Sequence, residues 1–169
     1  MRIRAIATAA VAATLLLGTA GCGVFTPTAT LKHYDASDGV SANTGQLHIR
    51  NAFIVTNEVG DAALVSSIVN DGDSLEFLKV EVRGDTVLST QVGAYPGLTK
   101  FGIADDNPIV FYGAGVTPGQ YVDVYFQYGD NEGQLVSLPV LDGTEAMYAP
   151  YAPTVAPAPT ATPADEATN

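Results

Sequence analysis

The alternation of apolar and polar side chains constrains the fold of this chain most. In residues 121–140, YVDVYFQYGDNEGQLVSLPV, apolar residues stand at every second position before the loop sequence GDNEG, and the chain then returns through a second apolar run. A period of two is typical of a strand with one buried face, and Gly, Asp and Asn between two such runs indicate a hairpin. The segment therefore predicts two antiparallel strands joined by a short loop.

Three further segments have the same character. Residues 46–55 and 61–70 are short, mostly apolar runs, and residues 74–92 hold two runs separated by the turn residues Gly84 and Asp85. After the first 21 residues, no window of ten or more shows the 3.6-residue apolar period of a helix. This pattern predicts an all-β fold, an antiparallel β-sandwich of the immunoglobulin-like kind, over residues 44–143.

The amino-terminal segment has a different composition. Arg2 and Arg4 precede an apolar stretch, and small residues at 18–21 precede Cys22, the single cysteine of the chain. A basic start, an apolar stretch too short for an ordinary membrane span and small residues at its end are typical of a secretory signal peptide. We therefore expect residues 1–21 to be a signal peptide that is removed.

Thr19, Ala20, Gly21 and Cys22 resemble the lipobox of bacterial lipoproteins. The resemblance implies a diacylglyceryl group on the Cys22 thiol, and hence a lipid anchor in the cell membrane on its extracytoplasmic face. The alternatives are an uncleaved anchor or plain secretion with a free thiol. Because a lone exposed thiol is a liability in an oxidising compartment, lipidation is favoured over any disulfide, metal-binding or catalytic role.

The net charge excludes whole classes of partner. The chain has 7 Lys and Arg against 18 Asp and Glu, and loss of Arg2 and Arg4 with the signal leaves 5 against 18, a formal charge of −13. Such an excess repels both the phosphates of nucleic acid and anionic lipid headgroups. We therefore expect no nucleic-acid partner, and a membrane contact made through the lipid anchor.

Both ends of the mature chain lack a strand pattern. Residues 22–43 are rich in Thr, Ala and Gly and predict a lipid-anchored, disordered tether. Residues 144–169 are rich in Pro, Ala and Thr, contain five of the ten prolines, and predict a disordered tail. The segment between them is long enough for one domain whose core needs no disulfide.

Three segments together resemble the PCu(A)C copper-chaperone family, and especially its LpqE-type actinobacterial lipoproteins. Within residues 45–141 they read IRNAFI, AALVSSIVNDGDSLEFLKVEV and GVTPGQYVDVYFQYGDNEGQLVSLPV. The resemblance implies a cupredoxin-like fold and an actinobacterial envelope protein. It also implies two His-x-Met copper sites, whose positions match Ser89 and Gln91, and Pro108 and Val110, and none of these residues is a Cu(I) ligand of that kind. The resemblance therefore implies the fold without the copper chemistry.

Few other residues could hold a metal. His33 and His48 are the two histidines and the weak candidates for copper or zinc, together with acidic loops at 70–73, 104–107 and 129–133. The same loops offer oxygen ligands for Ca²⁺, but none has the spacing of an EF-hand, and Asp, Asn and Gly are also what turns require. We expect no cofactor and no resident metal.

The motifs of common enzymes do not occur in the sequence. It contains no G-x-S-x-G, H-E-x-x-H or P-loop, and a carboxylate pair brought together by folding is the remaining catalytic option. The tripeptide Arg83-Gly84-Asp85 at a predicted hairpin tip is a weak adhesion signal, because Gly-Asp is an ordinary turn pair. The sequence therefore predicts that the protein is not an enzyme.

Tyr121 and Tyr125 are the candidate binding residues. If both lie on the solvent face with Asp123 between them, they supply the rigid amphipathic contact area that recognition surfaces use; the alternative is that the rings cover the core. We therefore predict a membrane-anchored, non-catalytic binding or assembly module whose partner is an envelope protein. A copper- or zinc-binding protein of PCu(A)C type with a degenerate site is the alternative.

Overall fold

The computed structural model describes residues 4, 6, 7, 35 and 37–155 of the 169. The chain divides into two compact units, residues 1–34 and residues 35–169. Cys22 and His33 lie outside the described residues, as does the predicted signal peptide apart from residues 4, 6 and 7. Residues 35–155 are called the domain below. No helix among the described residues is long and apolar enough to cross a bilayer.

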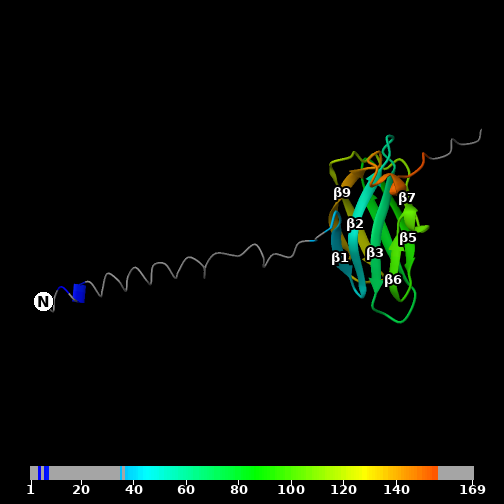
Figure 1. The fold of residues 1–169 in the computed structure, drawn as a ribbon. Coiled ribbons are helices and arrows are strands. Elements are labelled where there is room, and N and C mark those ends of the chain that lie inside the picture. The colour runs from blue at the N-terminus through cyan, green and yellow to red at the C-terminus, as the bar shows by residue number, and fades with distance from the viewer. Residues whose placement is uncertain (1–3, 5, 8–34, 36, 156–169) are drawn as a thin grey trace, which may run out of the picture. The chain divides into compact units, whose positions relative to one another are not determined.

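The domain is all-β, as the sequence predicts. Two single-turn 3-10 helices, Ile103–Asp105 and Ala149–Tyr151, accompany its strands. The strands are β1 (Val40–Thr44), β2 (Leu47–Thr56), β3 (Ala62–Asn70), β4 (Glu76–Arg83), β5 (Val87–Ala94), β6 (Gly97–Phe101), β7 (Ile109–Phe111), β8 (Tyr121–Tyr128) and β9 (Gln134–Asp142) (Figure 1).

The strands form one curled sheet in the order β5-β4-β8-β9-β2-β3-β6. One edge of β2 is shared, because its first half pairs with β1 and its last three residues pair in parallel with β9. One edge of β3 is shared in the same way by β6 and β7. A bulge between Arg50 and Phe53 separates the two halves of β2, and such a bulge bends and twists a strand. The sheet therefore curls around its own inner face.

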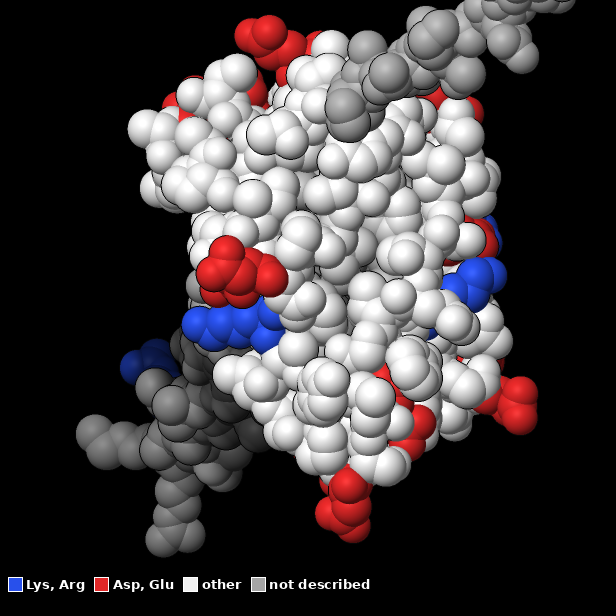
Figure 2. All heavy atoms as spheres, turned by 90° about the vertical axis from the view of Figure 1, so that its right-hand side faces the viewer, with Lys and Arg blue, Asp and Glu red and all other residues white. Residues whose placement is uncertain are grey.

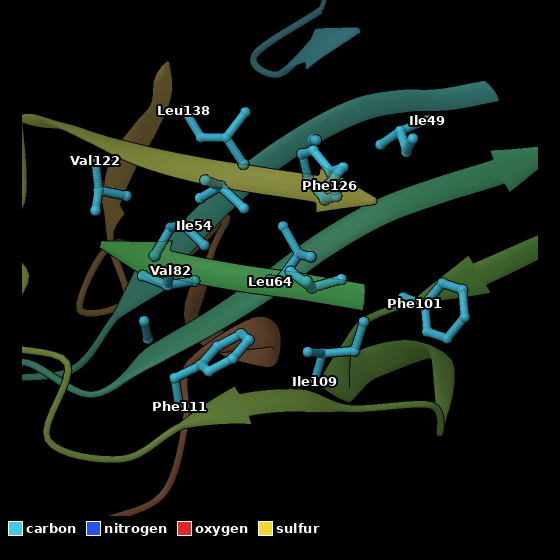
Figure 3. Packing of buried hydrophobic residues seen from close by; sticks show 14 of the residues in the cluster. Ile49, Ile54, Leu64, Val82, Phe101, Ile109, Phe111, Val122, Phe126 and Leu138 are labelled. Atoms are coloured by element: carbon cyan, nitrogen blue, oxygen red, sulfur yellow. The ribbon is translucent and has the colours of Figure 1, made fainter. Parts of the chain in front are cut away.

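The alternating apolar residues fill that inner face. In β4, Leu78, Val80 and Val82 are fully buried while the residues between them point outward, as the alternation predicts. Ile54 of β2 and Val82 of β4 belong to one buried cluster, whose side chains Figure 3 shows, so the two halves of the sheet share one core. This core holds β4, β5, β8 and β9 as a firm support for their outer surface.

The domain begins earlier than residue 44. Val40–Thr44 forms β1, and the backbone N–H and hydroxyl of Ser41 donate to the Asp35 carboxylate at 2.9 and 2.5 Å. The prediction that residues 22–43 are tether throughout is therefore wrong for this last part. The segment is short and polar, and it gains its order from pairing with β2 rather than from a period of its own.

The domain also extends beyond residue 143. Tyr148 and Tyr151 pack edge-to-face on Phe53 with ring centroids 6.2 and 6.5 Å apart, and the Asn57 side-chain amide donates to the Pro153 carbonyl at 3.2 Å. The prediction of a disordered tail is therefore wrong for residues 144–155. Aromatic rings supply the buried area that proline and alanine cannot. Residues 156–169 lie outside the described part of the chain.

Candidate binding face

Strand β8 places the two predicted tyrosines on the outer surface of the sheet. Tyr121 is 71% exposed and Tyr125 is half-buried, with exposed Asp123 between them, while Val122, Val124 and Phe126 are buried. At about 3.3 Å per residue, the two rings start roughly 13 Å apart on one strand. The structure thus places both tyrosines on the solvent face, and neither ring belongs to the core.

The neighbouring strands β4 and β9 complete a surface around these tyrosines. Tyr125 lies opposite Glu81 on one side and Leu135 on the other. Leu135 is 49% exposed although it is apolar. We call this surface the β8 face and define it by Lys79, Glu81, Arg83, Tyr121, Asp123, Tyr125, Leu135, Ser137 and Pro139.

Arg83 joins the charged and aromatic parts of the β8 face. Its guanidinium lies 2.9 Å from the Glu81 carboxylate and 5.6 Å from the centroid of the Tyr125 ring, within cation-π range. Lys79 contacts the other oxygen of Glu81 at 3.2 Å. Hydrogen bonds from Arg83 first, and then from Lys79, lower the pKa of Glu81 below its ordinary value. The carboxylate is therefore ionised at neutral pH and fixed in place.

Gly133, in the loop of the β8–β9 hairpin, lies against the ring of Tyr125. A Cβ atom built on Gly133 would lie 2.2 Å from the Cζ and hydroxyl oxygen of the Tyr125 ring. The ring therefore lies directly against the backbone of Gly133, and Arg83 lies within cation-π distance of the same ring. The loop sequence GDNEG, predicted as a hairpin connection, has this second role, which sequence alone did not predict.

The charges of the β8 face balance in an otherwise acidic domain. Counting residues 35–155 gives 4 Lys and Arg against 16 Asp and Glu, a formal charge of −12. Lys79 and Arg83 are two of those four cations, and they offset Glu81 and Asp123. Asp123 in addition accepts a hydrogen bond of 2.5 Å from the Ser137 hydroxyl. The face is therefore neutral overall and rich in apolar and aromatic area.

A hollow of about 260 Å³ adjoins the β8 face beside Tyr121. Asp85, Thr117 and Gln120 contribute polar side chains to its wall. The wall is tied to the sheet, because the backbone N–H of Val140 donates to the Gln120 carbonyl at 2.9 Å. This hollow gives a partner surface a shaped contact next to the most exposed tyrosine.

The Arg83-Gly84-Asp85 tripeptide does lie between β4 and β5, where the sequence places a turn. A Cβ on Gly84 would lie 2.2 Å from the Ala114 carbonyl oxygen, so the turn is pressed against the β7–β8 loop. An adhesion motif needs a tip that projects freely. The packing of Gly84 therefore favours the ordinary turn interpretation of this tripeptide.

The described metal candidates are used in other contacts. The Nδ1 atom of His48 lies 2.8 Å from Asn43 Oδ1, and its Nε2 atom lies 2.9 Å from Asp71 Oδ2. Both ring nitrogens thus have oxygen partners, and His33 lies outside the described residues. Within residues 35 and 37–155, no group of three or more His, Cys, Asp or Glu residues converges as a metal site.

The first acidic loop has a clear structural use. Asn70 is 2% exposed, and its side-chain amide donates to the carbonyls of Ser74 and Ala94 at 2.8 and 2.9 Å. Its Oδ1 accepts the backbone N–H of Gly72 at 2.9 Å. These bonds are those of a turn that also ties β3 to β5, which favours turn chemistry over calcium binding at residues 70–73.

Sequence reasoning missed Leu135, Glu81 and Arg83 as members of the face around Tyr125. A signal for Leu135 was present, because it occupies the outward phase of its strand although it is apolar.

Neither protein-family models nor curated protein sequences give a match to this chain. The interpretation of the β8 face therefore depends on its own geometry and chemistry.

Proposed function

We propose that this protein is a lipid-anchored, non-catalytic binding module of the cell envelope, with a domain that resembles the LpqE-type lipoproteins of the PCu(A)C family. Cys22 carries the lipid, on the extracytoplasmic face of the cell membrane, and the residues after it connect the anchor to the domain. The domain binds an envelope protein through the β8 face. The observation that carries this proposal is the row of outward-facing residues Tyr121, Asp123 and Tyr125 on a charge-balanced surface of the sheet.

The composition of the face supports a protein partner. Tyrosine and arginine are enriched among the residues that dominate protein-protein affinity, and charged residues are depleted from the centres of such interfaces. Here Tyr121 and Leu135 are exposed at 71% and 49%, while the charges of Glu81 and Arg83 neutralise each other. A partner that covers Tyr121 and Leu135 therefore buries apolar area beside a carboxylate, Glu81, whose charge is already paired. The Asp123 carboxylate between the tyrosines accepts a hydrogen bond from Ser137 and remains available to a donor on the partner.

The state of Glu81 supports a non-catalytic role. A general acid at neutral pH needs a carboxyl group whose pKa is raised, usually by burial or by a nearby negative charge. Glu81 has the opposite environment, because Arg83 and Lys79 donate to it and lower its pKa. Its arrangement is that of a group that orients Arg83 over Tyr125.

The proposal is tested by crosslinking in intact cells that make the full chain. We expect the variant Tyr121→Ala/Tyr125→Ala to lose at least about tenfold of its crosslinked partner, since two hot-spot residues together contribute more than ~1.4 kcal/mol to binding. Tyr112→Ala is the matched control, because Tyr112 is 47% exposed and lies outside the β8 face. Equal crosslinking by the double variant and the wild type would rule out this face.

A further inference from the structure

Strand β5 is a free edge of the sheet. All eight of its residues pair with β4, and no strand within residues 37–155 pairs with its other side. Among the described residues, one hydrogen bond reaches its backbone from elsewhere, from Asn70 Nδ2 to the Ala94 carbonyl. Ser89, Thr90 and Gln91 are exposed one after another, so both faces of the strand meet solvent at its centre. The outward N–H and C=O groups before Ala94 are therefore open to a partner strand.

This edge lacks the features that protect natural sheet edges. Exposed edges are usually short, charged, interrupted by proline or bulged, because a bare edge pairs with other chains. The sequence of β5, VLSTQVGA, has no charged residue and no proline, and its register with β4 has no shift. By contrast, β6 is five residues long and carries Lys100, and β1 is irregular where it pairs with β2. The bare edge of β5 is thus an exception within its own sheet.

An open groove of about 520 Å³ lies between β5 and β6. Phe77 and Tyr95 are 57% and 64% exposed at its rim, and Val92 and Phe101 contribute further apolar side chains. Figure 2 shows the side of the molecule on which β5, β6 and β7 lie, with charged side chains at the margins of a broad uncharged band. A strand that pairs with β5 would bring its alternate side chains to this groove.

We propose that β5 pairs with an extended segment of the partner protein, in the manner of β-strand addition. The segment alternates apolar and polar residues, is uncharged along its centre and carries Lys or Arg at its ends. This inference rests on the proposed function and deepens it, because β5 borders the β8 face. Ser89 of β5, Glu81 of β4 and Tyr125 of β8 lie in one row across the sheet, so one partner contacts edge and face together.

The negative charge around β5 favours pairing with a segment that has basic ends over pairing with β5 of a second copy of this chain. The domain has a formal charge of −12, from 4 basic and 16 acidic residues in 35–155. Asp85 precedes β5, and Glu76 pairs with Ala94 at the other end of the strand. Arg83 lies opposite Val87 at the Asp85 end of β5, but its charge is already offset by the Glu81 carboxylate. Antiparallel pairing of two copies of β5 would bring Asp85 of one copy toward Glu76 of the other, whereas Lys or Arg at the ends of a foreign strand would meet opposite charges.

The test uses the chain from residue 22 as Cys22→Ser and a synthetic probe, the capped peptide Arg-Val-Thr-Val-Thr-Val-Thr-Lys. We expect saturable binding by fluorescence anisotropy, with slower hydrogen exchange at the amides of β5. Methylation of alternate backbone nitrogens of the peptide removes its hydrogen-bond donors and should weaken binding at least tenfold. Replacement of both terminal basic residues by Glu should weaken it similarly.

The matched variants place one lysine on the edge or away from it. Gln91→Lys adds a charge to an exposed position of β5 and should weaken peptide binding at least tenfold, while Thr154→Lys adds the same charge at an exposed position elsewhere and should not. Peptide affinity that is unchanged by methylation of the peptide backbone, or by Gln91→Lys in the chain, would overturn the inference. A dimer of the chain that Gln91→Lys dissolves would identify a second copy as the occupant and overturn it as well.

The same variants separate this inference from the proposed function. In the crosslinking experiment, loss of the partner in both Tyr121→Ala/Tyr125→Ala and Gln91→Lys supports edge and face together. Loss in the tyrosine variant alone leaves the proposed function standing and overturns strand addition. Loss in neither variant overturns both.

Discussion

At the scale of single residues, the position of Tyr125 depends on a residue that has no side chain. The ring occupies the space in which a Cβ of Gly133 would lie, and Arg83 lies within cation-π distance of the ring. Gly133 is not among the residues with positive φ, so glycine is needed there for space and not for backbone conformation. The rigidity of the β8 face therefore depends on a contact within the hairpin.

Gly133→Ala should destabilise the domain by about 1–3 kcal/mol, because the added methyl group must displace the Tyr125 ring. The measurement is urea unfolding of four chains: wild type, Gly133→Ala, Tyr125→Ala and the double variant. In the Tyr125→Ala background the substitution at Gly133 should cost much less, because the colliding ring is gone. Strictly additive effects of the two substitutions would show that the ring and Gly133 do not compete for space.

The same residues show how far the sequence predicts the site. Alternation along β8 was sufficient to place Tyr121, Asp123 and Tyr125 on the same side of the strand, because that property depends on one strand alone, but it left open whether that side faces solvent or the core. The contacts of Tyr125 with Arg83 and Glu81 were beyond reach, because they depend on which strand lies beside β8. That pairing joins residues about 40 positions apart in the sequence and leaves no local signal.

At the scale of elements, the segment after β9 acts as a packed layer on the outer side of β2 and β3. Phe53, Val55 and Val65 form a small second cluster that Tyr148 and Tyr151 cover. The Tyr148 hydroxyl also donates to Asp38, which precedes β1, at 3.1 Å. Burial and the nearby Asp38 carboxylate raise the pKa of Tyr148. The two ends of the domain are thus held by one set of side chains.

A chain that ends at Gly143 should melt at a lower temperature than a chain that ends at Val155, by on the order of 5 °C or more, because Phe53 and Val65 become exposed. The measurement is thermal unfolding followed by circular dichroism. Tyr151→Ala in the longer chain is the matched control and should give part of the loss. Identical melting of the two truncated chains would mean that residues 144–155 contribute nothing to stability.

The sequence predicted the long strands and missed the short ones, because the long strands alternate along their own sequence and the short ones form only by pairing with a neighbour. The long strands β2 to β5, β8 and β9 were recognised because each contains enough alternation to identify a buried face. Strands β1, β6 and β7 have five, five and three residues, and they exist because an edge of β2 or β3 is available to them. The proline content led to the wrong prediction of a disordered tail over residues 144–155. This segment is ordered because Tyr148 and Tyr151 pack on Phe53.

At the scale of the whole molecule, charge distinguishes the two proposed binding surfaces from the rest of the domain. The described acidic side chains concentrate in turns and loops at the ends of the sheet, such as residues 71–73, 105–106 and 130–132. The β8 face is neutral overall, and β5 carries no charge. A domain of this kind resists association with copies of itself while it leaves one face and its bordering edge available.

The most direct measurement of the central claim is photo-crosslinking in intact cells from position 121. A photoreactive phenylalanine in place of Tyr121 keeps an aromatic ring on the β8 face. The same residue in place of Met147, which is 70% exposed in the segment after β9, is the control. We predict one protein adduct of discrete mass from position 121, in the membrane fraction and dependent on Cys22, and none from position 147. No adduct from position 121, or equal adducts from both positions, would contradict the account.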